Sequence, residues 1–477
     1  MSASSYRCPE LLVGGRWQPA RGERRLAVLD PSCGETLDEL ALAGAQDLQE
    51  ALDTAGSAFE AWRRIPAHER CARLERGVAR IRAEQERIAT LLTLEQGKPL
   101  AESRAECAMA ADLIKWYAEE ARRIHGRVIP ARQPDSRMTV LKQPVGPVAA
   151  FSPWNFPLVL SARKLGGALA AGCSIVLKAA EETPASVAAM IACLNEELPA
   201  GVLQLIYGVP GEVSQALIAS PVIRKVSFTG SVPVGRELAQ LAGRHLKRIT
   251  LELGGHAPVI VCDDADLERA VPQLVAHKFR NAGQACLAPT RFFVARRRHA
   301  AFLEAFTEAA RGLRLGPGLD ASTQMGPLAN TRRQAAVRQL IERSVQHGAR
   351  RLAGGAPDQG CFVAPTVLAD VPLDAPAMLE EPFGPVACVL PFDRLDEAIA
   401  MANRSAYGLA GYLYTDSAQA ILAVSEQLEV GSLAINGIGV SVPEAPFGGV
   451  KDSGHGSESG TEGLEAFLDT RSTHYTA

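Results

Sequence analysis

Residues 148–178 read VAAFSPWNFPLVLSARKLGGALAAGCSIVLK, in which two short apolar segments, 148–151 and 174–178, flank a helical stretch. Two more apolar segments, 203–206 and 225–228, follow with a helix between them. Short apolar strands that alternate with helices are typical of a buried parallel sheet made of βαβ units. The sequence therefore predicts an α/β fold built around this region.

A second alternating region begins at 258–262 and runs to about residue 440. The acidic cluster 263–266 is predicted to cap the first helix of this region. Residues 126–143 interrupt the pattern as a hairpin around the polar turn 133–136. Such a hairpin serves either as a flap over a site or as an arm for contact between subunits.

The first hundred residues are predicted to hold strands and two helices. Short strands are expected at 10–13 and 26–29. Apolar residues that share one face predict a helix over 48–62. A similar stripe predicts a single longer helix over 74–92, which ends before the signal Gly97-Lys98-Pro99.

Composition indicates a globular protein and excludes several classes. The chain has 477 residues, 47% of them hydrophobic and 22% charged, which allows two or three domains. A net charge of −3 gives no electrostatic basis for binding nucleic acid or an anionic membrane. No apolar run is long enough to cross a membrane, and residues 1–8 lack the apolar core of a signal peptide.

The cysteines and histidines point to a reducing compartment and to no metal site. The ten cysteines are scattered without a C-x-x-C pair, so free thiols in the cytoplasm are expected rather than disulfides. The nine histidines form no H-E-x-x-H motif, and no metal ion is predicted.

One thiol and one carboxylate, each next to glycine, are the strongest chemical signal. Cys286 lies in the run Asn-Ala-Gly-Gln-Ala-Cys, and Glu252 precedes Leu-Gly-Gly. A thiolate can attack an aldehyde carbon and hold it as a thioester, and a carboxylate can activate the water that releases the acid. Taken singly, Cys286 is more typical of an inert core thiol, and Glu252 is more typical of a surface or helix-capping carboxylate. The two local contexts together favour the catalytic interpretation.

Two segments at strand ends are candidates for a dinucleotide. The turn containing Gly230 and Ser231 follows a strand and opens a helix, where free N–H groups favour a phosphate. An ordinary βα turn is the alternative. Lys178 and Glu181 end another strand and can reach one ribose, and a carboxylate there repels a 2′-phosphate, which favours NAD over NADP. A surface ion pair is the alternative for these two.

Three more polar residues could act on the substrate. Asn155 lies in an apolar loop after a strand and could donate to an oxyanion, or it could cap the next helix. Arg163 lies about two helical turns further on, and Arg280 lies six residues before Cys286. Two guanidinium groups that converge near the thiol would bind a substrate carboxylate, whereas either arginine alone could be structural.

Together these residues resemble the aldehyde dehydrogenase superfamily over essentially the whole chain. The segments that carry the resemblance are Pro153-Trp154-Asn155, Lys178 to Glu181, the turn before Ser231, Glu252-Leu253-Gly254-Gly255, Gly283-Gln284-Ala285-Cys286, Glu381-Pro382-Phe383-Gly384-Pro385 and Pro446-Phe447-Gly448-Gly449. Their order along the chain makes this a specific signal.

The resemblance implies two α/β domains with parallel-rich sheets and a small β oligomerisation domain. It places an NAD-binding domain at 1–125 and 144–252, and a catalytic domain at 253–441. The oligomerisation arm and C-terminal segment take 126–143 and 442–477, in a homodimer or homotetramer.

The resemblance also implies a role for each site residue. Cys286 is the nucleophile, Glu252 the general base, and Asn155 an oxyanion donor. NAD is the implied cofactor, held by residues that include the ribose ligands and the loop aromatics: Trp154, Lys178, Glu181, Gly230, Ser231, Glu381 and Phe383. Glu458 matches a secondary carboxylate that relays protons.

Within the superfamily the chain is similar to succinate-semialdehyde dehydrogenases, and still more to 2-oxoglutarate-semialdehyde dehydrogenases. In the former group Arg163, Arg280 and Ser441 match positions that bind the substrate carboxylate. The implied reaction is NAD-dependent oxidation of a semialdehyde to a dicarboxylate. Leu287 and Ala288 stand where many of these enzymes carry a second cysteine, so thiol switching is not expected.

Four other functions compete with this interpretation. A general aldehyde dehydrogenase of broad specificity would use the same catalytic residues without an anion site. A CoA-acylating enzyme would lack the base that Glu252 supplies. A catalytically idle scaffold would not need Cys286, Glu252 and Asn155, and a cofactor-free cysteine hydrolase would not bind NAD.

Overall fold

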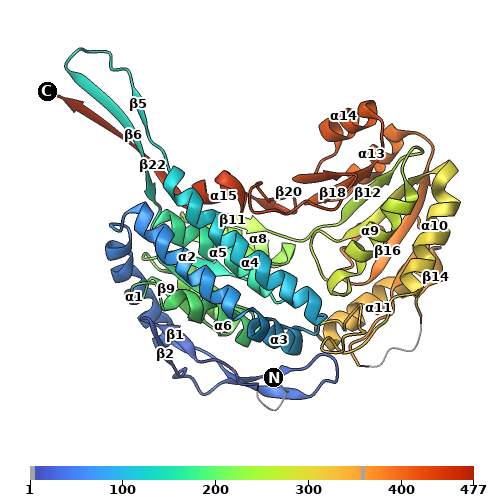
Figure 1. The fold of residues 1–477 in the computed structure, drawn as a ribbon, viewed down its shortest axis with the longest axis horizontal. Coiled ribbons are helices and arrows are strands. Elements are labelled where there is room, and N and C mark those ends of the chain that lie inside the picture. Colours follow the sequence, from blue (N-terminus) through green and yellow to red (C-terminus); the bar gives the residue numbers. More distant parts are fainter. Residues whose placement is uncertain (1–5, 356–359) are drawn as a thin grey trace.

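The computed structural model describes residues 6–355 and 360–477 (Figure 1). Residues 1–5 and 356–359, which belong to the predicted first and second domains, lie outside the described residues, and residues 1–5 are part of the segment in which no signal peptide is expected. Two large sheets, each with its own hydrophobic core and helices, make up the body of the protein, which confirms the α/β class.

The first sheet has eight strands in the order β2-β1-β9-β8-β7-β10-β11-β21. Its central strands, from β9 to β11 in that order, are all parallel. These strands are β1 (Leu11–Val13), β2 (Arg16–Gln18), β7 (Val148–Phe151), β8 (Ile175–Lys178), β9 (Leu203–Ile206), β10 (Lys225–Thr229), β11 (Arg248–Glu252) and β21 (Gly454–His455). Strands β7 to β10 are buried along their whole length, as the apolar segments predicted.

Helices cover both faces of this sheet, and one prediction about them is wrong. They are α1 (Ala45–Trp62), α2 (Ala67–Ala83), α3 (Gln85–Gln96), α4 (Leu100–Glu120), α5 (Pro157–Ala171), α6 (Pro184–Asn195), α7 (Pro210–Ala219), α8 (Val232–Arg244) and α15 (Gly460–Glu465). The single helix predicted over 74–92 is two helices, because Glu84 leaves helical geometry at φ −93° and ψ 6°. The apolar stripe continues across the break because Val78 and Ile88 enter the same core.

The second sheet has seven strands in the order β14-β15-β16-β13-β12-β18-β19, parallel except at β14. The strands are β12 (Ala257–Val261), β13 (Pro289–Ala295), β14 (Arg350–Ala353), β15 (Thr366–Ala369), β16 (Val386–Phe392), β18 (Ala410–Tyr414) and β19 (Ser432–Ile435). Its helices are α9 (Leu267–Phe279), α10 (Arg296–Arg311), α11 (Thr331–Gln346), α12 (Pro376–Leu379), α13 (Leu395–Asn403) and α14 (Ala418–Gln427). Asp266 caps α9 by accepting from the Arg269 N–H at 3.2 Å, which confirms the predicted cap.

A three-stranded arm projects from the first sheet, away from the second (Figure 1). It consists of β5 (Arg127–Ile129), β6 (Ser136–Pro144) and β22 (Leu468–Thr476), and β22 pairs with β6 along its whole length. The predicted hairpin is therefore confirmed, and its direction argues against a flap over the site. A smaller hairpin joins β3 (Arg25–Leu29) to β4 (Thr36–Ala41).

The chain returns from the second sheet to the first after β19. Strand β20 (Val450–Lys451) pairs with β17 (Tyr407–Gly408), and β21 then joins the edge of the first sheet beside β11. This return segment contributes to the site described below, because it brings Glu458 back to the carboxyl end of β11.

Candidate active site

The loops that carry Glu252 and Cys286 contact each other where the two cores meet. Glu252 ends β11, and the chain enters β12 after a short glycine segment. A Cβ atom at Gly255 would lie 2.1 Å from the Cys286 carbonyl oxygen, so only glycine permits this approach. Just before the cysteine, Asn281 and Ala282 adopt φ angles of 50° and 53°, a strained turn that presents the thiol.

Glu252 is buried without a partner for its charge. Glu252 is only 2% exposed to solvent. Neither of its carboxylate oxygens has a hydrogen-bond donor among the described residues. Burial raises its pKa well above the usual value, and the nearby charge of Glu458 raises it further. Arg163 and Lys164 partly offset this effect. A carboxylate of this kind can take a proton from a water molecule at its open oxygens.

Cys286 is half-buried, and its surroundings favour the neutral thiol. Burial raises the pKa of Cys286 to about 12, and the charge of Glu381 acts in the same direction. The guanidinium of Arg163 lowers this pKa, while the carboxylate of Glu252 raises it. Arg163 is therefore the cation that favours the thiolate.

The rate of aldehyde oxidation is expected to rise with pH from neutral into the alkaline range. Both the nucleophile and the base act only when deprotonated, and both have raised pKa values, so their active forms gain population as pH increases. Steady-state kcat/KM and the rate of iodoacetamide alkylation of Cys286, both measured from pH 6 to 10, check this. A maximum at or below neutral pH would contradict it.

Asn155 lies beside the cysteine loop. It follows β7 and precedes α5, and its side-chain amide donates to the Gln284 carbonyl oxygen at 3.1 Å. Its Oδ1 atom is buried and has no donor among the described residues. An amide has two N–H groups, so the second remains available for an oxyanion.

The two predicted arginines, Arg163 and Arg280, have different neighbours in the structure. The Arg163 guanidinium donates to the Ser441 hydroxyl at 2.5 Å and lies 4.1 Å from the centre of the Phe447 ring. Its Nε is buried and has no acceptor among the described residues. Arg280 instead lies over the Phe156 ring at 5.0 Å. The positive charge of Arg163 lowers the pKa of the Cys286 thiol.

Glu458 lies next to Glu252, at the centre of a buried polar network. It accepts from the Lys164 ammonium at 2.6 Å and from the Ser227 hydroxyl at 3.0 Å. Lys164 also donates to Thr229 at 2.7 Å. The sequence analysis missed Lys164, although a lysine inside the apolar helix after the Asn155 loop is an unusual residue that could have drawn attention.

The two predicted ribose ligands are paired with each other at the end of β8. The Lys178 ammonium lies 2.6 Å from one Glu181 oxygen, and the other oxygen accepts from the Gly208 N–H at 3.1 Å. Each carboxylate oxygen can accept a second hydrogen bond, so a ribose hydroxyl remains within the capacity of Glu181. Ser231 is exposed at the N-terminus of α8, where the open N–H groups suit a pyrophosphate.

Glu381 and Phe383 lie on the loop before β16, facing the glycine segment after Glu252. The Gly255 N–H donates to Glu381 at 2.9 Å, and burial raises the pKa of Glu381 to about 7. The Phe383 and Trp154 rings meet edge to face at 5.6 Å. These residues fit a nicotinamide cofactor, since they offer an acceptor for ribose hydroxyls and an aromatic wall beside the thiol.

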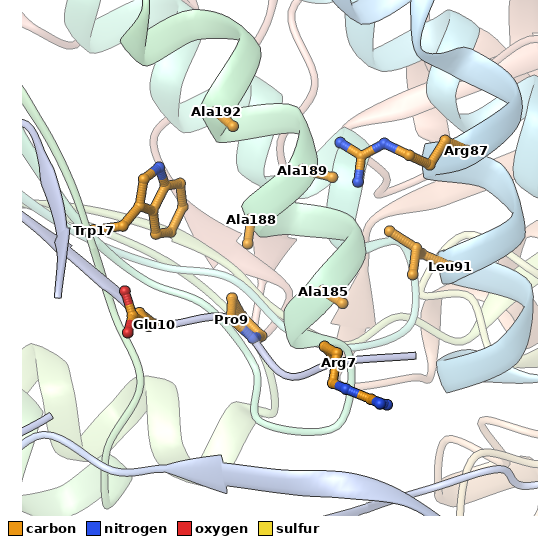
Figure 2. Close-up of a pocket in the computed structure, with 10 residues that line it drawn as sticks. All are labelled: Arg7, Pro9, Glu10, Trp17, Arg87, Leu91, Ala185, Ala188, Ala189 and Ala192. Atoms are coloured by element: carbon orange, nitrogen blue, oxygen red, sulfur yellow. The ribbon is translucent and has the colours of Figure 1, made fainter. Parts of the chain in front are cut away.

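Two other features lie outside this site. A cavity of about 350 Å³ between the N-terminal segment, α3 and α6 contains none of the predicted site residues (Figure 2). Trp17, Arg87 and a row of α6 alanines line it. Within residues 6–355 and 360–477, no group of three or more His, Cys, Asp or Glu side chains could hold a metal ion.

A buried carboxylate, a thiol and an amide donor lie on neighbouring loops where the two α/β cores meet, and groups of these kinds can form and hydrolyse a thioester. Residues 17–473 match the model of the aldehyde dehydrogenase family, and the chain belongs to that family. It is thus an enzyme of aldehyde oxidation with a nicotinamide cofactor.

Similar proteins differ in what they oxidise. The chain is 75% identical, over all of both chains, to a 4-(hydroxymethyl)benzenesulfonate dehydrogenase of Comamonas testosteroni. It is 41% identical to an NADP-dependent succinate-semialdehyde dehydrogenase of Escherichia coli, which covers 97% of this chain and 96% of the relative. The NAD complex of an aldehyde dehydrogenase from Bacillus cereus has a TM-score of 0.96, 35% identity, and coverage of 98% of this chain and 97% of that chain.

Proposed function

We propose that the protein oxidises an aldehyde that carries an anionic group, using NAD, and releases the carboxylic acid. The observation that carries this proposal is the Arg163 side chain, which is buried beside the thiol, held by Ser441, and left with an Nε lacking an acceptor among the described residues. A buried guanidinium with free donor capacity favours an anionic ligand.

A sulfonate on an aromatic ring is the favoured anion. The relative at 75% identity, named for 4-(hydroxymethyl)benzenesulfonate, supports this choice. The aldehyde at the next oxidation level, 4-formylbenzenesulfonate, has a carbonyl carbon that a thiol nucleophile can attack. The Phe156 and Phe447 rings, each next to an arginine, suit an aromatic substrate. A carboxylate-bearing semialdehyde, such as succinate or 2-oxoglutarate semialdehyde, is the second candidate, favoured by the Arg163 to Ser441 contact and by the relative at 41% identity.

The residues act in sequence on the aldehyde carbon. The Cys286 thiolate forms a carbon–sulfur bond, and the Asn155 amide and the Cys286 N–H donate to the resulting oxyanion. A bound nicotinamide supplies the acceptor for the hydride that this carbon loses. Glu252 then takes a proton from water, whose oxygen attacks the thioester carbon and breaks the carbon–sulfur bond. Glu458 and Lys164 can carry that proton away from Glu252.

We also propose NAD rather than NADP, because the Glu181 carboxylate would repel a 2′-phosphate on the ribose. Self-association into a homodimer or homotetramer through the arm is supported by the exposed apolar side chains of Val128, Leu141 and Tyr475 there. The cytoplasm is the proposed location, since all ten cysteines are free thiols. No helix in the described part of the chain is long and apolar enough to cross a membrane. Small-molecule aldehydes, not nucleic acids, are the proposed partners.

The test is NADH or NADPH formation with a panel of four aldehydes. The panel holds 4-formylbenzenesulfonate, 4-formylbenzoate, succinate semialdehyde and benzaldehyde, each with both cofactors. We expect kcat/KM for 4-formylbenzenesulfonate with NAD to exceed that for benzaldehyde by about 10- to 100-fold, the range of a charge-assisted hydrogen bond. The highest value with succinate semialdehyde would favour the second candidate, and equal values for benzaldehyde would contradict both.

A further inference from the structure

Lys98 lies outside the active site proper, yet its charged end is buried against the Asn155 loop. It follows Gly97, whose φ of 91° and close packing against Pro31 and Pro327 fix the turn after α3. Its side chain is 0% exposed. A lysine this deeply buried requires partners for its charge.

The Lys98 ammonium has two hydrogen-bond acceptors and one aromatic neighbour. Lys98 Nζ donates to the Asn155 carbonyl oxygen at 2.7 Å and to Glu106 Oε2 at 2.5 Å. The same ammonium lies 4.0 Å from the centre of the Phe156 ring. Lys98 therefore contacts both the main chain of the oxyanion residue and the aromatic side chain that follows it.

Two glutamates of α4, Glu102 and Glu106, connect Lys98 to the loop that carries Asn155 and to the loop that carries Cys286. The second Glu106 oxygen accepts from the Leu158 N–H at 2.9 Å, in the first turn of α5. One turn earlier, Glu102 accepts from the Asn281 N–H at 2.8 Å, at the strained turn before the cysteine. The Asn281 amide in turn donates to the Asn155 carbonyl oxygen at 2.9 Å. Residues 98, 102 and 106 thus connect the two loops.

We propose that Lys98, together with Glu102 and Glu106, is a positioning cluster that holds the Asn155 amide in place for the oxyanion. The Asn155 carbonyl oxygen accepts from Lys98, after α3, and from the Asn281 side chain in the cysteine loop, so rotation of its peptide is blocked and the side-chain amide stays beside the cysteine. This inference rests on the proposed oxyanion role of Asn155. Lys98 itself touches neither the aldehyde nor the cofactor.

The test is a double-mutant cycle with Lys98→Met, Asn155→Ala and the combined variant. The measured quantity is kcat/KM for benzaldehyde, an uncharged aldehyde, so the result does not depend on the proposed anion site. Asn155→Ala is expected to lose about 10²- to 10³-fold, as for a deleted oxyanion donor. Lys98→Met is expected to lose about 10- to 100-fold, because a misplaced donor forfeits part of that effect.

The combined variant is expected to lose no more than about threefold beyond Asn155→Ala, because residues that act through one group are not additive. The KM for NAD should stay near the wild-type value, whereas the thermal midpoint is expected to fall, because Lys98→Met leaves the buried Glu106 carboxylate without its cation. Lys225→Met is the matched control, since Lys225 is as deeply buried but donates to Thr250 at 2.6 Å, away from the Asn155 loop. The fold loss in kcat/KM caused by Lys225→Met should multiply with the fold loss caused by Asn155→Ala when the two are combined.

The inference would be overturned if the combined variant loses kcat/KM by the product of the losses of Lys98→Met and Asn155→Ala. If Lys98→Met does not fold, Glu106→Gln, which keeps the shape but not the charge, takes its place in the cycle with the same expectation. A loss of less than about threefold in Asn155→Ala alone would overturn the oxyanion role, and the positioning role with it. Failure of the anionic-aldehyde proposal would leave this cycle unaffected, because benzaldehyde carries no charge.

Discussion

A Glu252→Gln enzyme is expected to form one NADH per active site in a rapid burst and then to slow by about 10²- to 10⁴-fold, the usual value of a general base. The first half of the reaction needs only the thiolate, the oxyanion donors and the cofactor. The second half needs a base for water, and Glu252 has both oxygens open beside the thiol loop. Glutamine fills the same space but cannot accept the proton, so the thioester accumulates.

Stopped-flow absorbance at 340 nm measures the burst, and mass spectrometry of the quenched protein measures the acyl group on Cys286. Cys286→Ala is the control, which should show neither a burst nor turnover while it still binds NAD. Slow steady turnover of Glu252→Gln without a burst would place Glu252 before hydride transfer and would contradict its assignment as the hydrolytic base.

Replacing Arg163 by methionine is expected to lower the ratio of kcat/KM for anionic over uncharged aldehydes by about 10- to 100-fold. The ratio matters because Arg163 also lowers the pKa of the thiol, so the variant should slow every substrate to some extent. Both substrates share that loss, and it cancels in the ratio. What remains is the lost attraction between guanidinium and substrate anion.

Arg280→Met is the matched control for this measurement. Arg280 lies over the Phe156 ring, whereas Arg163 is hydrogen-bonded to Ser441, so removal of Arg280 should change the ratio by less than Arg163→Met does. If both variants lower the ratio equally, the result would support the sequence prediction that Arg163 and Arg280 bind the substrate anion together. An unchanged ratio in Arg163→Met would return Arg163 to a structural role with Ser441 and Phe447.

Sequence patterns predicted the sheets better than the helix boundaries. The strands 148–151 and 203–206 are found where the apolar segments indicated, because burial on both faces leaves a signal within the strand itself. The break at Glu84 left no such signal. Its glutamate is a good helix former, and the apolar stripe on either side faces one core, so only the path of the backbone shows the interruption.

The candidate site was predictable where chemistry lies in short motifs, and hidden where it depends on distant contacts. Cys286, Glu252 and Asn155 stand in recognisable local runs, and the fold brings their loops together. Lys98 and Lys164 are single lysines whose partners lie far away in the chain. The apolar helix around Lys164 is the only local hint for this pair, and Lys98 has none, because the role of each lysine follows from its burial and from the residues that surround it.

The pairing of Lys164 with Glu458 has a consequence for biosynthesis. The two residues are 294 positions apart, so a ribosome must make most of the polypeptide before the lysine meets its carboxylate. Until then, a nascent first domain would have to bury an uncompensated ammonium or leave that part of its interior unfinished. The late arrival of Glu458 thus ties completion of the first core to completion of translation, and a truncated product should be a ready substrate for proteases.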